Sequence, residues 1–419
     1  MQAVILAAGK SERFYPYTNY GHKALIKVLG KTILEQTLLS IKKADITDVV
    51  IVTGKENPIE KIIGDGSHLG VAITYVVQPE PLGMGDALLH AESSIHDDFF
   101  LLHASHVDFH EFKKVLEEKK RTGVDNVLLA REVINPEHFG ILRIEGDKVL
   151  EITEKPTRGK EPSNLKVIGV YLLSHSFFKT LKGITQEHYS FEKALTEHAE
   201  KTTMSFVKTD IVEVSLKYPW DVLQISNYLL TTNIPFTSDK AIVSPHAIIV
   251  GDVIVEAGAK IMEGACIKGP CYIGKNAIIG NNAIVRNKAV IGEGVVIGAN
   301  MEVKNSVFLD NTTTHSGFIG DSVVGSNCKI AANFHTGNVR LDREENQVTV
   351  GEKEVKTGRN SLGVIMGDGV SIGIGVSTMP GLVIGNKAVI GPATMVSKNI
   401  APDTLLYTTF ETVEKKRAG

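Results

Sequence analysis

The sequence predicts two domains of different architecture: an α/β domain with a Rossmann-like, mostly parallel sheet, followed by a left-handed parallel β-helix of hexapeptide repeats. Two observations support this prediction. The hydrophobic period changes near the middle of the chain, and the length of 419 residues exceeds the size at which one hydrophobic core usually stops growing. We place the first domain at 1–232, the β-helix at 240–405 and a C-terminal tail at 406–419.

Short apolar runs alternate with amphipathic stretches in the first half of the chain. The runs predict strands at 3–6, 49–53, 73–77, 99–102, 127–130 and 167–173. The stretches between them predict helices at 33–43, 85–94 and 112–121. This alternation indicates βαβ units, and ligands of such sheets bind beyond the carboxyl ends of the strands.

The second half has a six-residue period. An aliphatic residue occupies twelve consecutive positions of this period: Val243, Ile249, Val255, Ile261, Ile267, Ile273, Ile279, Val285, Ile291, Ile297, Val303 and Leu309. The pattern resumes at Ile372, Ile384, Ile390 and Val396, with Thr378 in the remaining slot. Hexad periodicity is typical of a parallel β-helix, whose aliphatic residues point into a triangular coil. We expect a loop insertion at about 326–362, because the charged stretch 340–345 cannot lie inside a coil.

The composition limits the partners and the compartment. A formal net charge of −3 gives no support to a nucleic-acid or anionic-membrane partner. Three cysteines have no metal-ligand spacing, and their odd number argues against a disulfide framework. No apolar run approaches the roughly 20 residues of a membrane span, and the start does not read as a signal peptide. We therefore expect a cytoplasmic protein.

A glycine-containing turn follows the first predicted strand. It reads Leu6-Ala7-Ala8-Gly9-Lys10-Ser11-Glu12-Arg13 and continues through Pro16 and Thr18 to Lys23. Backbone N–H groups of such a turn can approach a triphosphate, and Arg13 and Lys23 can neutralise charge on the transferred phosphoryl group. This string resembles the signature of the nucleoside-triphosphate transferase family. Three positions depart from it: Ser11 replaces Gly, Glu12 replaces Thr and His22 replaces Pro.

Further fragments match the family in the same order. They are Gln78–Gly83, Phe139-Gly140, Glu154-Lys155-Pro156, Asn164 and Gly169-Val170-Tyr171. Met84 stands where the family has a Thr after Gly83. The resemblance implies a nucleotide-binding set of Leu6, Ala8, Gly9, Gln78 and Gly83. It implies a sugar-phosphate-binding set of Gly140, Glu154, Lys155, Asn164 and Gly169, with Arg13 and Lys23 as catalytic residues.

The family holds Mg²⁺ with two aspartates, and both are missing here. Alignment places Ser105 at the first of these positions, and counting back from Pro219-Trp220-Asp221 places Ser215 at the second. Hydroxyls are poor ligands for a hard dication that prefers carboxylates. His106 or Asp108 could substitute, but a strand residue three positions on points to the other face, so we favour a loop or capping role for Asp108.

The β-helix half resembles that of archaeal-type bifunctional glucosamine-1-phosphate acetyltransferase and N-acetylglucosamine-1-phosphate uridylyltransferase. The resemblance covers nearly the whole chain. It implies that His315 is the general base for an acetyl acceptor, with Asn338 on the substrate side and acetyl-CoA as cosubstrate. Phe318 replaces a Tyr, and Ser361 stands where a Lys holds phosphate. The alternative for His315 is a structural or surface histidine.

Two interpretations of function follow. The first is a sugar-1-phosphate nucleotidyltransferase that joins a nucleoside triphosphate to a sugar-1-phosphate and releases pyrophosphate. The alternative is a regulatory or binding paralogue that keeps the sugar-nucleotide site but lacks turnover. Closure of the flat faces of the β-helix predicts a homotrimer, or a dimer of trimers.

Overall fold

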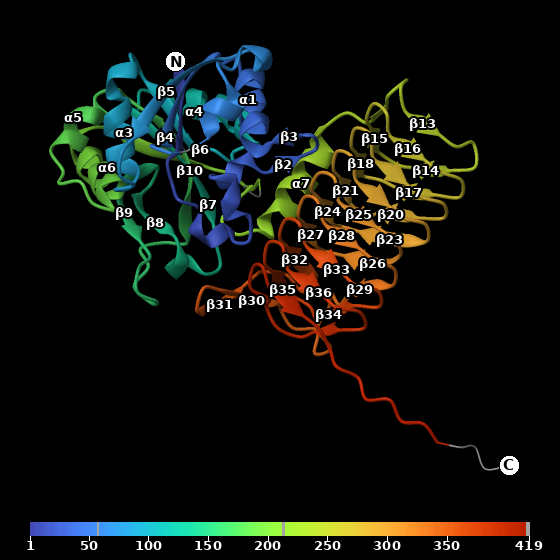
Figure 1. Ribbon diagram of the computed structural model, residues 1–419. Coiled ribbons are helices and arrows are strands. Elements are labelled where there is room, and N and C mark those ends of the chain that lie inside the picture. The colour runs from blue at the N-terminus through green and yellow to red at the C-terminus, as the bar shows by residue number, and fades with distance from the viewer. Residues whose placement is uncertain (57, 212–213, 416–419) are drawn as a thin grey trace. The chain divides into compact units, whose positions relative to one another are not determined.

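A computed structural model describes residues 1–56, 58–211 and 214–415 of the chain (Figure 1). The chain divides into two compact units. The first comprises Met1–Ser11, Tyr20–Ile26 and Thr32–Ser215, and the second comprises Glu12–Asn19, Lys27–Lys31 and Leu216–Gly419. Residues 216–232, which the sequence assigned to the first domain, therefore belong to the second unit together with two short N-terminal segments.

A nine-stranded sheet with the order β5-β4-β1-β6-β10-β7-β11-β9-β8 forms the core of the first unit. Its strands are β1 (Gln2–Ala7), β4 (Asp48–Gly54), β5 (Ala72–Gln78), β6 (Phe99–His103), β7 (Asn126–Glu132), β8 (Gly140–Glu145), β9 (Lys148–Glu154), β10 (Leu165–Leu173) and β11 (Met204–Lys208). Parallel pairing joins β5, β4, β1 and β6, as a Rossmann-like sheet requires. Strand β10 runs antiparallel to both β6 and β7. All six predicted strands are confirmed, whereas β8, β9 and β11 were not predicted.

Helices cover both faces of this sheet. They are α1 (Ile33–Lys43), α2 (Ile59–Ile63), α3 (Met84–Ala91), α4 (Phe109–Lys120), α5 (Phe177–Lys182) and α6 (Ser190–Lys201), with short 3-10 turns η3 (Lys23–Leu25), η4 (Ser67–Leu69), η5 (Glu92–Ser94) and η6 (Pro136–His138). Helices α3, α5 and α6 pack together over the face that carries Val4, Val50 and Leu101. Helices α1 and α4 pack on the other face, where Phe100 meets Phe109 edge to face. Because helices pack on both faces of the sheet, the ends of the strands remain available for a ligand-binding site.

Three parallel sheets form the coil of the second unit, a left-handed parallel β-helix (Figure 1). The first sheet contains β12 (Phe236–Thr237), β15 (Val253–Val255), β18 (Cys271–Ile273), β21 (Val290–Ile291), β24 (Val307–Phe308), β27 (Val323–Val324), β32 (Val364–Met366) and β35 (Leu382–Ile384). The second contains β13 (Ile242–Val243), β16 (Lys260–Ile261), β19 (Ile278–Ile279), β22 (Val296–Ile297), β25 (Thr313–Thr314), β28 (Lys329–Ile330), β33 (Ser371–Ile372), β36 (Val389–Ile390) and β38 (Leu405–Leu406).

The third sheet of the coil contains β14 (Ile248–Val250), β17 (Cys266–Lys268), β20 (Ile284–Arg286), β23 (Met301–Lys304), β26 (Gly317–Gly320), β29 (Phe334–Thr336), β34 (Ser377–Thr378) and β37 (Met395–Val396). The remaining elements are η1 (Glu12–Phe14), η2 (Tyr17–Tyr20), β2 (Lys27–Val28), β3 (Lys31–Thr32), α7 (Asp221–Thr232) and a hairpin of β30 (Gln347–Val350) and β31 (Lys353–Lys356). The coil begins at β12, a few residues before the predicted 240. Its last strand includes the first residue of the tail predicted at 406–419, of which 416–419 lie outside the described residues.

From Val255 to Val303 the hexad residues fill the interior of the coil as predicted. On the first turn, Ile249 is only partly buried and Val243 is 36% exposed. Ile249 pairs directly with Ile267, so a full turn of the coil takes three hexads, one for each sheet. Ile291, however, pairs with Phe308 rather than with the next hexad residue, Leu309. Phe308 therefore takes the interior position that the sequence assigned to Leu309, because this turn is one residue short.

The loop insertion starts later than the sequence indicated. Val324 and Ile330 still lie in the core of the coil. They belong to turns that are shorter than three hexads, so they fall outside the strict six-residue period. The coil leaves its path only after Thr336, whose partner on the next turn is Thr378, on the far side of the insertion. The insertion therefore begins after Thr336 rather than at 326. Among the described residues, no helix combines the length and apolar character that a membrane crossing needs.

Candidate functional site

The first predicted loop leaves the sheet at its carboxyl edge. Leu6 lies opposite His103 on the neighbouring strand β6. The turn that follows exposes Gly9 and half-exposes Ala8. Ser11 adopts a φ of +56°, the left-handed conformation that a glycine would take most easily, and its Oγ accepts a hydrogen bond from the Lys23 backbone N–H at 3.1 Å. The hydroxyl thereby ties the turn to the chain at Lys23.

Arg13 lies on a different unit from Gly9. It is an exposed residue of Glu12–Asn19, the segment that packs with the β-helix. Tyr17 anchors this segment: its side chain is fully buried, and its hydroxyl lies 2.8 Å from the Met366 carbonyl and 3.1 Å from the Val323 carbonyl. The signature string is therefore divided between two compact units.

Gln78, the predicted base-reading residue, is buried and fixed at the end of β5. Its Nε2 donates to the Gly83 carbonyl at 3.1 Å and to the Asp86 carboxylate at 2.7 Å. Gly83 has a φ of +110°, and a Cβ there would come 2.8 Å from the His188 carbonyl, so only glycine fits. The structure brings Gln78 and Gly83 together. Asp86 was missed, and its position in the first turn of α3 was the available signal.

Three of the five predicted sugar-phosphate residues meet at the end of the β8–β9 hairpin. Gly140 pairs directly with Glu154. A Cβ on Gly140 would lie 2.7 Å from Glu154 Oε2, so the absence of a side chain gives that carboxylate its place. Lys155 follows with its Nζ 3.8 Å from Glu154 Oε1 and 3.5 Å from the Tyr189 hydroxyl. Gly140, Glu154 and Lys155 are therefore brought together.

Asn164 and Gly169 occupy separate places, Asn164 just before β10 and Gly169 within it. Asn164 is exposed, and its carbonyl accepts a hydrogen bond from Val133 N–H at the edge of the strand. Gly169 lies at a bulge with a φ of +83°, where a Cβ would come 2.9 Å from the His103 ring. Gly169 therefore makes room for His103, a residue that the sequence did not single out.

Glu192 adds a carboxylate that sequence reasoning missed. Burial raises the pKa of Glu192, and the nearby Glu154 raises it further. Its Oε2 is buried without a hydrogen-bond partner among the described residues. Glu192 follows Phe191, whose ring packs edge to face against Tyr171 in the core. Its spacing in α6 gave no functional signal, because the burial arises from the strands packed against that helix.

Asp108 joins the two segments that carry the serines aligned with the metal aspartates. It is fully buried, and its Oδ1 lies 3.3 Å from His106 Nδ1. Its Oδ2 accepts a hydrogen bond at 3.2 Å from the N–H of Val214, the residue before Ser215. Ser105 is buried in the same loop after β6. The carboxylate is thus occupied in holding the fold together, in agreement with the structural role that we favoured.

Basic and imidazole side chains gather at the same strand end. The rings of His103 and His106 stack with centroids 6.2 Å apart. His103 also interacts electrostatically with Lys23 and His22. Burial lowers the pKa of His22 to about 3, with Lys23 as a second cause, and its Nδ1 accepts a hydrogen bond from Ala24 N–H. The His103 side chain is partly in contact with solvent. Its pKa is nevertheless lowered, mainly because the surrounding protein reduces its hydration and also because His106 and Lys23 lie nearby.

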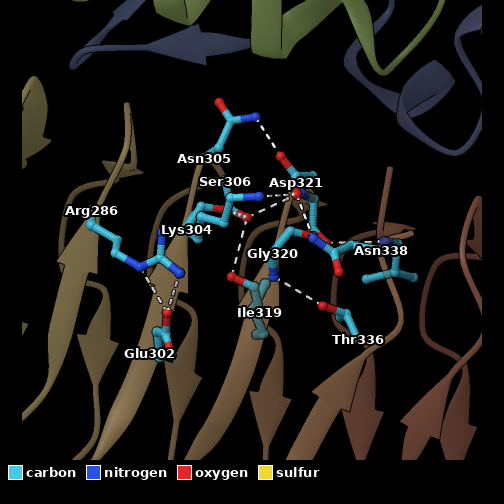
Figure 2. Close-up of polar contacts among 12 residues, drawn as sticks. Arg286, Glu302, Lys304, Asn305, Ser306, Ile319, Gly320, Asp321, Thr336 and Asn338 are labelled. Atoms are coloured by element: carbon cyan, nitrogen blue, oxygen red, sulfur yellow. Dashed lines mark hydrogen bonds and ion pairs between the residues drawn. The ribbon is translucent and has the colours of Figure 1, made fainter. Parts of the chain in front are cut away.

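On the β-helix, Asn338 belongs to a polar cluster around Asp321 (Figure 2). The Asp321 side chain is 4% exposed and accepts hydrogen bonds from Lys304 Nζ at 3.0 Å, Asn305 Nδ2 at 2.7 Å and Asn338 Nδ2 at 2.5 Å. Three donors satisfy a carboxylate that would be costly to bury alone. Asn338 is therefore engaged in holding a corner of the coil.

His315 lies apart from this cluster. It is exposed, just before β26, and its ring makes no hydrogen bond within the part of the chain that the structure describes. Strand β26 pairs with β29 so that Gly317 lies opposite Phe334. His315 is therefore at one end of this strand pair and Asn338 at the other. Within one chain, the structure does not bring the two predicted acetyl-site residues together.

Two further residues lie in the insertion. Ser361 forms an isolated antiparallel bridge with Val339. Arg359 was missed, although its guanidinium is largely enclosed: burial lowers its pKa, while the carboxylates of Asp221 and Asp321 act in the opposite direction. Nothing in the sequence indicated that this side chain is enclosed, because most arginines in loops are solvated.

Comparison with known proteins gives two family matches and many full-length relatives. The family described as "Nucleotidyl transferase" matches residues 2–220, and the family described as "GMPPB C-terminal domain" matches 267–376. The chain is 36% identical to the bifunctional protein GlmU of Methanococcus maripaludis (strain C7) and 31% identical to that of Methanocaldococcus jannaschii, over 99–100% of each chain. It is 30% identical to a bifunctional sugar-1-phosphate nucleotidylyltransferase/acetyltransferase of Sulfurisphaera tokodaii, over 96% of this chain and 98% of that one.

The chain belongs to the nucleotidyl transferase family. The predicted resemblance to the archaeal bifunctional enzymes is confirmed, and the chain is a nucleotidyltransferase. Nothing in the comparisons supports the alternative interpretation as a binding paralogue.

Nucleotidyl transferases generally use a divalent metal, but the donor set at this site does not fit one. The aligned positions carry the neutral hydroxyls of Ser105 and Ser215, and Asp108 uses its carboxylate for His106 and Val214. Across 1–56, 58–211 and 214–415, no three His, Cys, Asp or Glu side chains are grouped as a metal would need. Mg²⁺ prefers carboxylate oxygens, so we derive no step through it.

Proposed function

We propose that this nucleotidyltransferase joins a nucleoside triphosphate to a sugar-1-phosphate and releases pyrophosphate. The meeting of Gly140, Glu154 and Lys155 at the end of the β8–β9 hairpin supports this proposal most directly. The carboxylate can accept hydrogen bonds from sugar hydroxyls, and the ammonium can bind the phosphate. Gln78, held by Gly83 and Asp86, is then the residue that recognises the base.

In the reaction, an oxygen of the sugar-1-phosphate attacks the α-phosphorus of the triphosphate. A new P–O bond forms while the bond between the α- and β-phosphates breaks, and the electron pair leaves with pyrophosphate. The protein contributes position and charge: Lys155 orients the attacking phosphate, and Lys23 stabilises negative charge on the triphosphate. The three free thiols support a reducing, cytoplasmic setting.

A second activity, acetyl transfer, is proposed for the β-helix, because one full-length relative is named a sugar-1-phosphate nucleotidylyltransferase/acetyltransferase. The exposed His315 imidazole supports it, because a general base must reach its substrate. Acetyl-CoA and an amino-sugar phosphate would be the cosubstrates. Thiol release from acetyl-CoA tests this activity: we expect His315→Asn to abolish it and His335→Asn, an exposed residue on the next turn, to leave it unchanged. Equal loss in both variants would contradict it.

Pyrophosphate release across a panel of triphosphates and sugar-1-phosphates tests the main proposal. We expect Gly140→Ala to raise KM for the sugar phosphate about tenfold or more, because its Cβ would lie 2.7 Å from Glu154 Oε2. KM for the triphosphate should change little.

Gly183→Ala is the matched control. Gly183 has an ordinary φ of −77° at the end of α5, and a Cβ there would come no nearer than 3.3 Å to the Thr180 carbonyl. A Gly140→Ala enzyme with unchanged kinetics would remove the sugar phosphate from this strand end.

A further inference from the structure

The end of β6 has an unusual balance of charge for a site that receives a triphosphate. Ser105 and Ser215 are neutral where the family has two carboxylates, and Asp108 is withdrawn into the fold by His106 and Val214. The site has thus lost the groups that hold a dication. It has also lost the negative charges that repel a bare phosphate.

Two hydrogen-bond donors, His103 and Lys23, lie close to this strand end. His103 lies opposite Leu6, at the strand end from which the phosphate-binding turn departs. Its ring stacks on His106, which is itself oriented by Asp108. Gly169 leaves room for the His103 ring, since a Cβ there would come within 2.9 Å. Lys23, tied to the turn through Ser11, is an electrostatic neighbour of His103.

We propose that His103 and Lys23 bind the triphosphate directly and that its binding at this site requires no divalent ion. The inference rests on the proposed function, because it concerns the same triphosphate site. A neutral imidazole donates a hydrogen bond from one ring nitrogen, and an ammonium donates three, so the donors needed by phosphate oxygens come from the chain. Where the family interposes a metal, this protein binds the anion itself.

Calorimetry with uridine and thymidine triphosphates, in excess EDTA and in millimolar MgCl₂, tests the inference. We expect the better of the two nucleotides to bind in EDTA with less than about a tenfold loss of affinity relative to MgCl₂. A loss of tenfold or more overturns the inference and leaves the proposed function intact. Absence of binding in both buffers overturns the proposed function and the inference with it.

His103→Phe tests the residue that carries the argument. Phenylalanine keeps a ring to stack on His106 but removes both nitrogens, and we expect affinity in EDTA to fall about tenfold. His96→Phe is the matched control, an exposed histidine just before the other end of the same strand. A loss below about threefold for His103→Phe overturns the inference.

Thermal unfolding must show that His103→Phe is folded. If it is not, Lys23→Met is the second variant, because it keeps the backbone N–H that bonds to Ser11 while removing the ammonium. The same threefold limit applies to it.

Discussion

Asp108 is a carboxylate placed beside a phosphate site but used for structure. Its two oxygens hold His106 and the Val214 backbone, and these contacts bring together the two segments that carry the aligned serines. A carboxylate with both oxygens occupied has little left to offer a cation. The properties of the site therefore depend on which carboxylates are accessible rather than on how many are nearby.

Restoring the missing aspartates tests that alignment. We expect the double variant Ser105→Asp, Ser215→Asp to gain a Mn²⁺ site detectable by electron paramagnetic resonance, because two carboxylates recreate an oxygen donor set. Each single variant should bind far less, since one carboxylate seldom holds such an ion against its hydration. Strong Mn²⁺ binding by the unaltered protein at this site, abolished by Asp108→Ala, would contradict the expectation.

Ionisation of the Glu192 carboxyl opposes folding. Its folded-state pKa is raised by burial, so the charged form costs stability above its ordinary pKa. We expect Glu192→Gln to raise Tm at neutral pH and the gain to vanish at acidic pH, where the carboxyl is protonated in both states. Glu200→Gln, on the exposed side of α6, is the control and should leave Tm unchanged at both pH values.

The elements divide into those whose period is visible in the sequence and those that depend on distant partners. Strands β1, β4 and β6 were predicted because each is a buried apolar run with turn residues at its ends. The edge strand β5 was predicted from its apolar residues, although most of its side chains are exposed or only partly buried. The hairpin β8–β9 and strand β11 were not, since their alternation is weak and their pairing is set by β7 and β10. In the coil, strands β27, β28 and β29 belong to turns that are shorter than three hexads, so the strict six-residue period did not predict them.

The same distinction holds for the candidate site, where residues in a family motif were predictable and residues that depend on distant neighbours were not. Gln78, Gly83, Gly140, Glu154 and Lys155 were predictable because a family string fixes them at strand ends. By contrast, His103, Asp86 and Glu192 matter only through neighbours that folding brings to them, and Asn338 is bound to Asp321 rather than free at the surface. A linear pattern does not encode such contacts.

The hydrogen bonds to Asp321 hold one corner of the coil together. We expect Asp321→Asn to lower the free energy of unfolding by about 2–3 kcal/mol, because Lys304 loses its buried counter-charge. Asparagine tolerates the φ of +50° at this position, so backbone strain does not confuse the result. Denaturant unfolding followed by circular dichroism measures the change.

Glu302→Gln, which removes a partner of Arg286 on the more exposed part of the same sheet, is the comparison for the Asp321 variant. We expect a change below about 1 kcal/mol, the usual limit for exposed ion pairs. An equal effect in both variants would mean that burial of Asp321 is unimportant.

The coil exposes apolar side chains on its outer surface. Ile242 is 61% exposed, Val250 58% and Met395 58%. Ile242 and Val250 lie on the first turn of the coil and Met395 on its last. Exposed apolar side chains favour association, and flat faces favour closed symmetry. We expect a homotrimer through the β-helix, with three times the chain mass by light scattering.

Val250→Glu should weaken the trimer and Ile134→Glu should not, since Ile134 is 95% exposed on the other unit. A monomer at micromolar concentration before any substitution would contradict the proposal of a trimer.

The anchoring of Tyr17 has a consequence for synthesis on the ribosome. The segment around Arg13 is among the first to be translated, yet its anchor at Met366 lies 349 residues downstream, and the Asn386 side chain that bonds to the Pro16 carbonyl lies 370 residues downstream. Chains emerge in order, so the segment must wait until most of the coil has been made. A truncated or stalled chain lacks the support for Arg13, and only a nearly complete translation product acquires the full signature loop.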